Sequence, residues 1–100
     1  MKKKVKTVRT KSAKDLANFL GLDAEDAVEI EFRAKLVKKI IDVVEEEGLT
    51  HAEVAKMSGT SRTRVTAILN HRTDDISSDL MVRILASLGY IAKVRFQKAS

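Results

Sequence analysis

Arginine and threonine side chains cluster in a short segment without acidic residues, from Arg62 to Thr66. Arginine can donate two parallel hydrogen bonds to guanine, and threonine can contact the thymine methyl group or a phosphate. The alternative is a solvated helix face whose arginines pair with nearby acids. We favour base-edge contacts, and the candidate residues for them are Arg62, Thr63, Arg64 and Thr66.

Further hydrogen-bond donors lie on either side of this segment. His51 stands where a preceding helix should begin, and the free backbone N–H groups and positive dipole end of such a helix favour a phosphate. Polar and basic residues also follow the arginine segment and precede the turn before it. The residues expected to bind the DNA backbone are His51, Lys56, Asn70, His71 and Arg72.

Catalytic and metal-binding chemistry have little support in the sequence. The two histidines are twenty residues apart, cysteine is absent, and no third ligand is arranged beside either histidine. Serine, histidine and aspartate all occur, but no spacing singles out a nucleophile with its base. A glycine-rich phosphate loop is also absent. We therefore expect no enzyme, no metal site and no cofactor.

Two short helices joined by a turn at Gly59 would position the candidate residues. Thr50 can cap the first helix, and Glu53, three positions later, completes a capping box. Gly59 stands where the chain must reverse sharply, and glycine enters the left-handed backbone conformation without a Cβ clash. Ser61 can then cap the second helix.

The apolar residues of these two helices indicate which faces are buried. The predicted inward positions are Val54, Ala55 and Met57 in the first helix and Val65, Ile68 and Leu69 in the second. The arginines and threonines of the second helix then face outward at its N-terminal end. This arrangement predicts a helix-turn-helix whose second helix enters a DNA major groove. An ordinary αα-hairpin uses the same caps and turn and is the alternative.

Three further helices are predicted around this hairpin. A short one runs from residue 12 to 20, a long one opens near Asp23 and ends at Gly48, and the last is capped at Ser77 and ends at Gly89. The predicted buried stripe of the long helix comprises Ala27, Ile30, Ala34, Val37, Ile41 and Val44, widened by Leu36 and Ile40. In the last helix, Ile76 and Met81 suit a hydrophobic staple, and the buried face comprises Leu80, Ile84, Leu85 and Leu88. The fold class is therefore all-α, a bundle of about five helices.

Residues 90–96 change to a period of two, which predicts a short C-terminal β-strand. A lone strand is not stable, so its partner must be residues 5–9, another protein's sheet, or the same strand of a second copy. A frayed extension is the remaining alternative. We favour a homodimer, because pairing with a twin is self-complementary about a two-fold axis. The expected dimerisation residues are Tyr90, Ile91, Ala92, Val94 and Phe96.

The length of 100 residues and the composition indicate a single domain. The absence of cysteine fits a reducing cytoplasm, which is the expected location. The basic N-terminus has no apolar run behind it, and no stretch approaches the roughly 20 apolar residues that span a bilayer. We therefore expect a soluble protein without membrane association.

The net charge of +5 conceals an asymmetry along the chain. Residues 1–14 carry seven basic groups and no acid, residues 15–47 carry ten acids against four bases, and residues 48–73 carry one acid against four bases. Residues 1–11 should form a flexible basic arm that binds DNA, folds on a protein partner or aids solubility. The helix-turn-helix domain with its dimerisation strand should cover residues 12–96, and residues 97–100 should form a tail.

These features together resemble the xenobiotic-response-element family of lambda-repressor-like helix-turn-helix proteins. The residues that carry the resemblance are Gly48, Leu49, Thr50, Glu53, Ala55, Gly59, Ser61, Val65 and Ile68. The segments FLGL (19–22), AEDAVEIEFRAKL (24–36) and SSDLMVRILASLGY (77–90) resemble its HigA-type antitoxin branch. The resemblance covers residues 12–96 and implies a lambda-repressor-like bundle. His51 replaces the family's usual glutamine and Thr60 its usual apolar residue, which changes the expected base preference more than the fold.

The resemblance implies a transcriptional repressor that is also the antitoxin of a type II toxin–antitoxin module. Such proteins neutralise a RelE-like or HigB-like toxin and repress their own operon. Because a homodimer would present two reading helices, its operator should be near-palindromic double-stranded DNA. Two alternatives remain open at the level of the sequence. One is a stand-alone phage or mobile-element regulator without a toxin, and the other is a protein-interaction module that no longer binds DNA.

Overall fold

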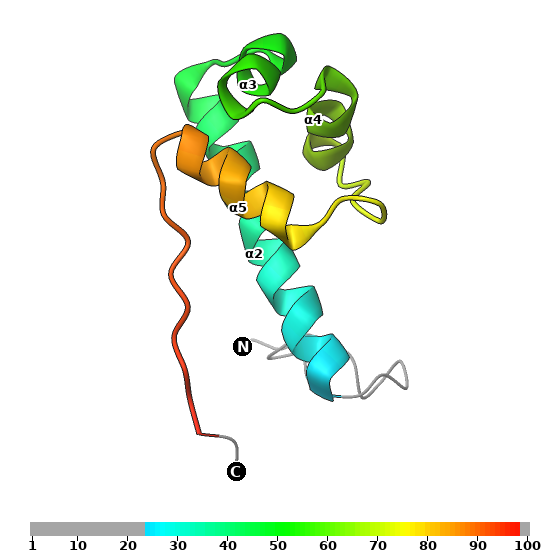
Figure 1. Ribbon diagram of the computed structural model, residues 1–100, viewed down its shortest axis with the longest axis vertical. Coiled ribbons are helices and arrows are strands. Elements are labelled where there is room, and N and C mark those ends of the chain that lie inside the picture. Colours follow the sequence, from blue (N-terminus) through cyan, green and yellow to red (C-terminus); the bar gives the residue numbers. More distant parts are fainter. Residues whose placement is uncertain (1–23, 99–100) are drawn as a thin grey trace, which may run out of the picture. The chain divides into compact units, whose positions relative to one another are not determined.

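A computed structural model of the chain describes residues 24–98, and this part contains four helices (Figure 1). They are α2 (Ala24–Glu47), α3 (His51–Ser58), α4 (Arg62–Leu69) and α5 (Ser78–Ser87). The predicted helix over residues 12–20, the basic arm over residues 1–11 and the last two residues of the tail lie outside the described residues. The prediction of a helical fold is confirmed for the described part.

Helix α2 is the longest element and ends where the sequence predicts. Gly48 adopts the left-handed conformation at φ 63°, and the Leu49 amide donates to the Val44 carbonyl over 3.0 Å. The described chain divides within this helix into two compact units, with the boundary between Lys35 and Leu36. No helix within residues 24–98 is long and apolar enough to cross a membrane.

The buried face of α2 differs from the predicted stripe. Its second unit buries Leu36, Val37, Ile40, Val43 and Val44, and Ala27 is buried in the first unit. The prediction was wrong for Ile30, which is 38% exposed, and for Ala34, which is also exposed, and it missed Val43. At 3.6 residues per turn, Ala34 lies about 120° around the helix from Ile40. Ile41 stands at the edge of the buried face and is half-buried.

The helices after α2 pack around a common apolar centre, in which α3 contacts both α4 and α5. The predicted inward residues are buried with three exceptions: Leu69 and Leu80 are half-buried, and Met57 is 48% exposed. At 100° per residue, Met57 lies about 60° from Val54 and about 160° from Ala55, so it stands at the flank of the buried face of this short helix. The fully buried side chains of this centre include Val54, Val65, Ile68, Met81 and Ile84.

Helix α5 begins with the predicted cap and staple. The Ser77 hydroxyl accepts a hydrogen bond from the Leu80 amide over 3.1 Å, and Ile76 and Met81 are buried on either side of this cap. The helix ends at Ser87, with Leu88 as its C-cap and Gly89 in the left-handed region at φ 95°. The sequence therefore predicted both ends of α5.

Residues 90–98 follow α5 as a tail without secondary structure (Figure 1). The Tyr90 amide donates to the Leu85 carbonyl over 2.9 Å, and the Lys39 ammonium lies 4.4 Å from the centre of the Tyr90 ring. Beyond this anchor Ile91 is 82% exposed and Phe96 is 93% exposed. The predicted strand over residues 90–96 is therefore not formed in the single chain, because a strand requires a neighbouring strand for its ladder of hydrogen bonds.

Candidate nucleic-acid interface

Local hydrogen bonds fix the α3–turn–α4 hairpin at both helix starts and at the turn. The Thr50 amide donates to Glu53 Oε1 over 2.8 Å, and the Glu53 amide donates to Thr50 Oγ1 over 3.1 Å, which completes the predicted capping box. Gly59 has φ 72°, and its amide donates to the Ala55 carbonyl over 2.9 Å. Ser61 Oγ accepts from the Arg64 amide over 3.1 Å and caps α4. These four sequence predictions are confirmed.

The outward face of α4 presents cations that pair with none of the described acids. Val65 and Ile68 are each 1% exposed, whereas Arg62, Thr63 and Arg64 are exposed to solvent. The ion pairs found among residues 24–98 all join residues of α2, and none includes an arginine of α4. The alternative interpretation, in which these arginines pair with nearby acids, therefore has no support in this part of the chain.

His51 and Thr66 contact each other across the hairpin. His51 Nδ1 lies 2.8 Å from Thr66 Oγ1, and both side chains are partly buried. The two residues are 15 positions apart, so only the crossing of α3 and α4 brings them together. The sequence predicted each of them as a separate DNA contact, and the pairing was missed because neither residue type nor spacing encodes a helix crossing.

The start of α3 offers fewer free amides than a helix start without a capping box. The capping box uses the amides of Thr50 and Glu53 and places a carboxylate beside them. A carboxylate at a helix N-terminus stabilises the helix but repels a phosphate. Of the first amides in this turn, those of His51 and Ala52 remain available for an anion.

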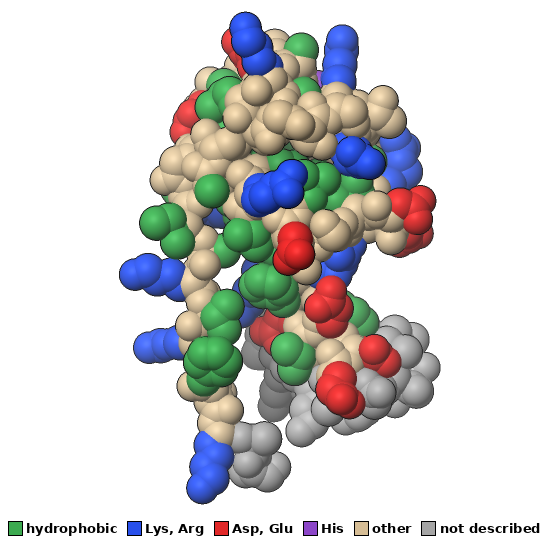
Figure 2. All heavy atoms as spheres, in the orientation of Figure 1, with side chains coloured by type: hydrophobic (Ala, Val, Ile, Leu, Met, Phe, Trp, Pro, Cys, Tyr) green, Lys and Arg blue, Asp and Glu red, His purple; other side chains and the backbone are tan. Residues whose placement is uncertain are grey.

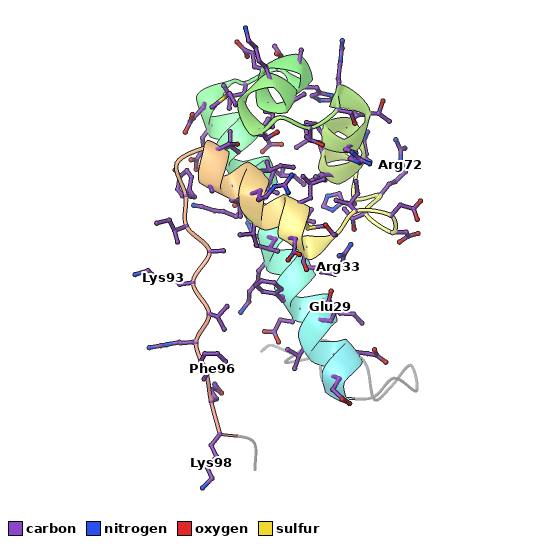
Figure 3. The ribbon with its side chains drawn as sticks, in the orientation of Figure 1. Glu29, Arg33, Arg72, Lys93, Phe96 and Lys98 are labelled. Carbon is purple, nitrogen blue, oxygen red and sulfur yellow. The ribbon has the colours of Figure 1, made fainter. Side chains whose placement is uncertain are left out.

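The end of α4 carries three of the predicted backbone contacts, Asn70, His71 and Arg72, and all three are exposed. The His71 amide donates to the Ile68 carbonyl over 3.0 Å, and the Arg72 amide donates to the Ala67 carbonyl over 2.8 Å. His71 itself is left-handed, with φ 60°, a conformation that non-glycine residues rarely adopt. These hydrogen bonds end α4 at Leu69 and place Arg72 just beyond the end of the helix (Figure 3).

A hollow of about 560 Å³ lies between one face of α4 and the loop that follows it. Its lining combines the predicted contacts of α4 and the loop with two aspartates that were not predicted as site residues. Figure 2 shows basic side chains around the α3–α4 end and acidic ones beside the loop. The lining residues are Thr63, Arg64, Ala67, His71, Arg72, Asp74, Asp75 and Ile76.

The two aspartates, Asp74 and Asp75, are exposed and can affect recognition in two ways. A carboxylate accepts a hydrogen bond from the cytosine amino group, and it also repels a phosphate that comes too close. The remaining predicted contact, Lys56, is exposed in the last turn of α3. Within residues 24–98 no group of three or more histidine, aspartate or glutamate side chains could hold a metal ion.

Comparison with protein families places this hairpin in a known class. A family model described as "Helix-turn-helix domain" matches residues 12–97 of the chain. No curated protein matches the chain, and no solved structure does. Because the family model covers most of the chain, the protein belongs to this helix-turn-helix domain family, whose members are DNA-binding modules.

Proposed function

We propose that this member of the helix-turn-helix domain family is a sequence-specific transcriptional repressor that binds a near-palindromic operator as a homodimer. We further propose that it is the antitoxin of a type II toxin–antitoxin module and represses its own operon. The observation that carries the DNA-binding proposal is the solvent-exposed face of α4, where Arg62 and Arg64 have no acidic partner within residues 24–98.

In this proposal α4 enters the major groove and its first turns read base edges. Arg62 and Arg64 each donate to the acceptors of a guanine, and Thr63 contacts a thymine methyl group or a phosphate. Lys56 on α3 and the residues after α4 bind the backbone on either side, which fixes the register of the helix. The phosphate contacts of this second set are expected from Lys56, Asn70, His71 and Arg72.

The homodimer proposal is supported by the tail. Ile91, Val94 and Phe96 are 82%, 63% and 93% exposed, which leaves apolar side chains in water beside backbone groups that a strand could use. Pairing of residues 90–96 with the same segment of a second copy would cover both. The two copies of α4 would then read half-sites about one helical turn of DNA apart, ~34 Å.

The antitoxin proposal is supported by the three segments that resemble the HigA-type branch and by the surface of α2. In its first unit, α2 exposes Val28 (68%) and Ile30 (38%) among acidic residues, and Glu45, Glu46 and Glu47 are exposed at its end. A small basic toxin would find complementary charge and apolar area on the first unit of α2 and, separately, complementary charge at the end of the helix in the second unit. Co-expression tests this role: the adjacent reading frame should encode a small basic protein that is toxic alone and harmless together with this chain.

The DNA-binding proposal is tested by removing the two arginines. A duplex enriched by the wild-type protein from a random-sequence pool serves as the specific probe, and a shuffled duplex as the non-specific one. Arg62→Ala and Arg64→Ala should each cost about 1–3 kcal/mol of binding to the specific duplex and reduce the preference over the shuffled one. Fluorescence anisotropy at several salt concentrations measures both.

A control variant removes two positive charges from α2, one more than either arginine variant. Lys35→Ala combined with Lys38→Ala changes two side chains that are 75% and 77% exposed and already paired with acids. This variant should keep the preference for the specific duplex, whereas retained preference in the Arg62 and Arg64 variants would refute base reading by α4.

A chain without residues 1–11 should bind DNA with a shallower dependence on salt concentration if the arm binds phosphates.

The dimer is tested in the tail. Val94→Pro removes a backbone N–H from the proposed intermolecular ladder, so the variant should sediment as a monomer and bind the operator more weakly. Lys98→Pro, which lies beyond the proposed strand, is the control and should remain dimeric. A Val94→Pro variant that sediments as a dimer would show that the tail is not the interface.

A further inference from the structure

We propose that Thr66 is a positioning residue that holds the His51 imidazole toward a DNA backbone phosphate, so that the two side chains form one clamp across the α3–α4 hairpin. This inference rests on the proposed DNA-binding function and assigns to Thr66 a role other than reading a base. The observation that carries it is the 2.8 Å separation between His51 Nδ1 and Thr66 Oγ1.

The contact joins the first residue of α3 to the second turn of α4. Both side chains are partly buried, so water competes less for this hydrogen bond than for one on the open surface. Neighbouring Arg62, Thr63 and Arg64 are exposed, whereas Thr66 is half-buried. Among the candidate contacts on α4, Thr66 is therefore distinguished by having its hydroxyl already engaged.

The chemistry of imidazole explains what this hydrogen bond can do. When the threonine hydroxyl donates to Nδ1, the neutral ring carries its proton on Nε2. Nε2–H is then a donor with a fixed direction, and a phosphate oxygen is a suitable acceptor for it. The amides of His51 and Ala52, which the capping box leaves unused, can add donors to the same phosphate. Thr66 thus acts on DNA through His51.

A double-mutant cycle tests this assignment with the two duplexes defined above. Thr66→Val and His51→Ala should each weaken binding by about three- to tenfold, as expected for the loss of one hydrogen bond. A phosphate contact carries no sequence information, so the loss should be equal on the specific and the shuffled duplex. In the His51→Ala background, Thr66→Val should have no further effect. With His51 in place, Thr66→Ser should retain wild-type affinity for both duplexes.

Three results would overturn the proposal. The first is a Thr66→Val variant that loses affinity for the specific duplex only, because Thr66 would then read a base directly. The second is additivity of the two substitutions, because the side chains would then act independently. Unchanged binding by Thr66→Val would likewise refute it.

A spectroscopic measurement separates this inference from the proposed function. Nitrogen-15 NMR of the His51 ring in the free protein should show a proton on Nε2 and an acceptor at Nδ1, and Thr66→Val should change this pattern while Thr66→Ser preserves it. If no duplex is bound, the proposed function fails and the clamp fails with it. If the Arg62 and Arg64 variants lose base preference while Thr66→Val leaves binding and the ring signals unchanged, the clamp alone is refuted.

Discussion

Helix α2 and the α3–α4 hairpin use their polar residues in opposite ways. In α2, acidic and basic side chains four positions apart pair with each other, as in Lys38–Asp42 at 3.0 Å. In the hairpin, Thr50, Glu53 and Ser61 bond to backbone amides at helix starts, and the cations of α4 pair with none of the described acids. Two adjacent parts of one chain are thus held by different kinds of interaction.

This difference shows how a helix can be ordered and still keep its charges for a ligand. Pairs at i,i+4 stabilise a helix weakly and neutralise the charges that form them. Caps and a left-handed glycine stabilise the hairpin without using a single guanidinium. Disruption of the turn or a cap should therefore lower the free energy of unfolding more than disruption of a surface ion pair.

The largest effect is expected at the turn. Nothing lies within 4 Å of a Cβ built on Gly59, so the cost of a side chain there comes from the backbone at φ 72°. Gly59→Val should lower the free energy of unfolding by about 1–2 kcal/mol, since a β-branched residue is strained in this conformation. Thermal denaturation followed by circular dichroism measures the change. Gly59→Asn is the control and should cost less, because asparagine tolerates the left-handed region.

A smaller effect of opposite sign is expected next to the turn. Thr60 Oγ1 is buried and has no hydrogen-bond partner among the described residues. Thr60→Val replaces the unsatisfied hydroxyl with a methyl group of similar shape and should raise the stability by about 1 kcal/mol. Thr63→Val makes the same exchange at an exposed position of α4 and should leave the melting temperature unchanged. A destabilised Thr60→Val variant would show that the hydroxyl has a partner.

The smallest effect is expected in α2. The side chains of Lys38 and Asp42 are 77% and 41% exposed, so solvent screens their attraction. The coupling free energy of Lys38→Ala and Asp42→Ala in a double-mutant cycle should be about 0.3–0.5 kcal/mol. A value as large as the Gly59 effect would contradict the distinction between the two regions.

The sequence predicted the elements of the fold wherever local chemistry determines them. Thr50, Ser61 and Ser77 cap helices, and Gly48 and Gly59 end them, because these preferences depend on a few neighbouring backbone groups. The buried face of α2 was predicted less well. Ile30 and Ala34 fit a regular spacing but are exposed, since burial depends on which elements pack against the helix and a spacing alone does not contain that information.

The candidate interface shows the same limit. Exposure of Arg62 and Arg64 followed from the inward positions of Val65 and Ile68 on one helix. Pairing of His51 with Thr66 and the position of Asp74 beside α4 depend on how separate segments meet in space. The predicted tail strand has a further requirement, since a ladder of hydrogen bonds needs a neighbour that a single chain does not supply.

The closure of α4 at His71 also limits how much genetic information one copy of the protein can read. Eight residues at 1.5 Å each give a helix of about 12 Å, close to the width of the major groove. At 3.4 Å per base step, such a helix spans only about four base pairs. A sequence of about four base pairs recurs throughout any genome. A unique binding site therefore requires two copies of the protein that read two half-sites at a fixed spacing.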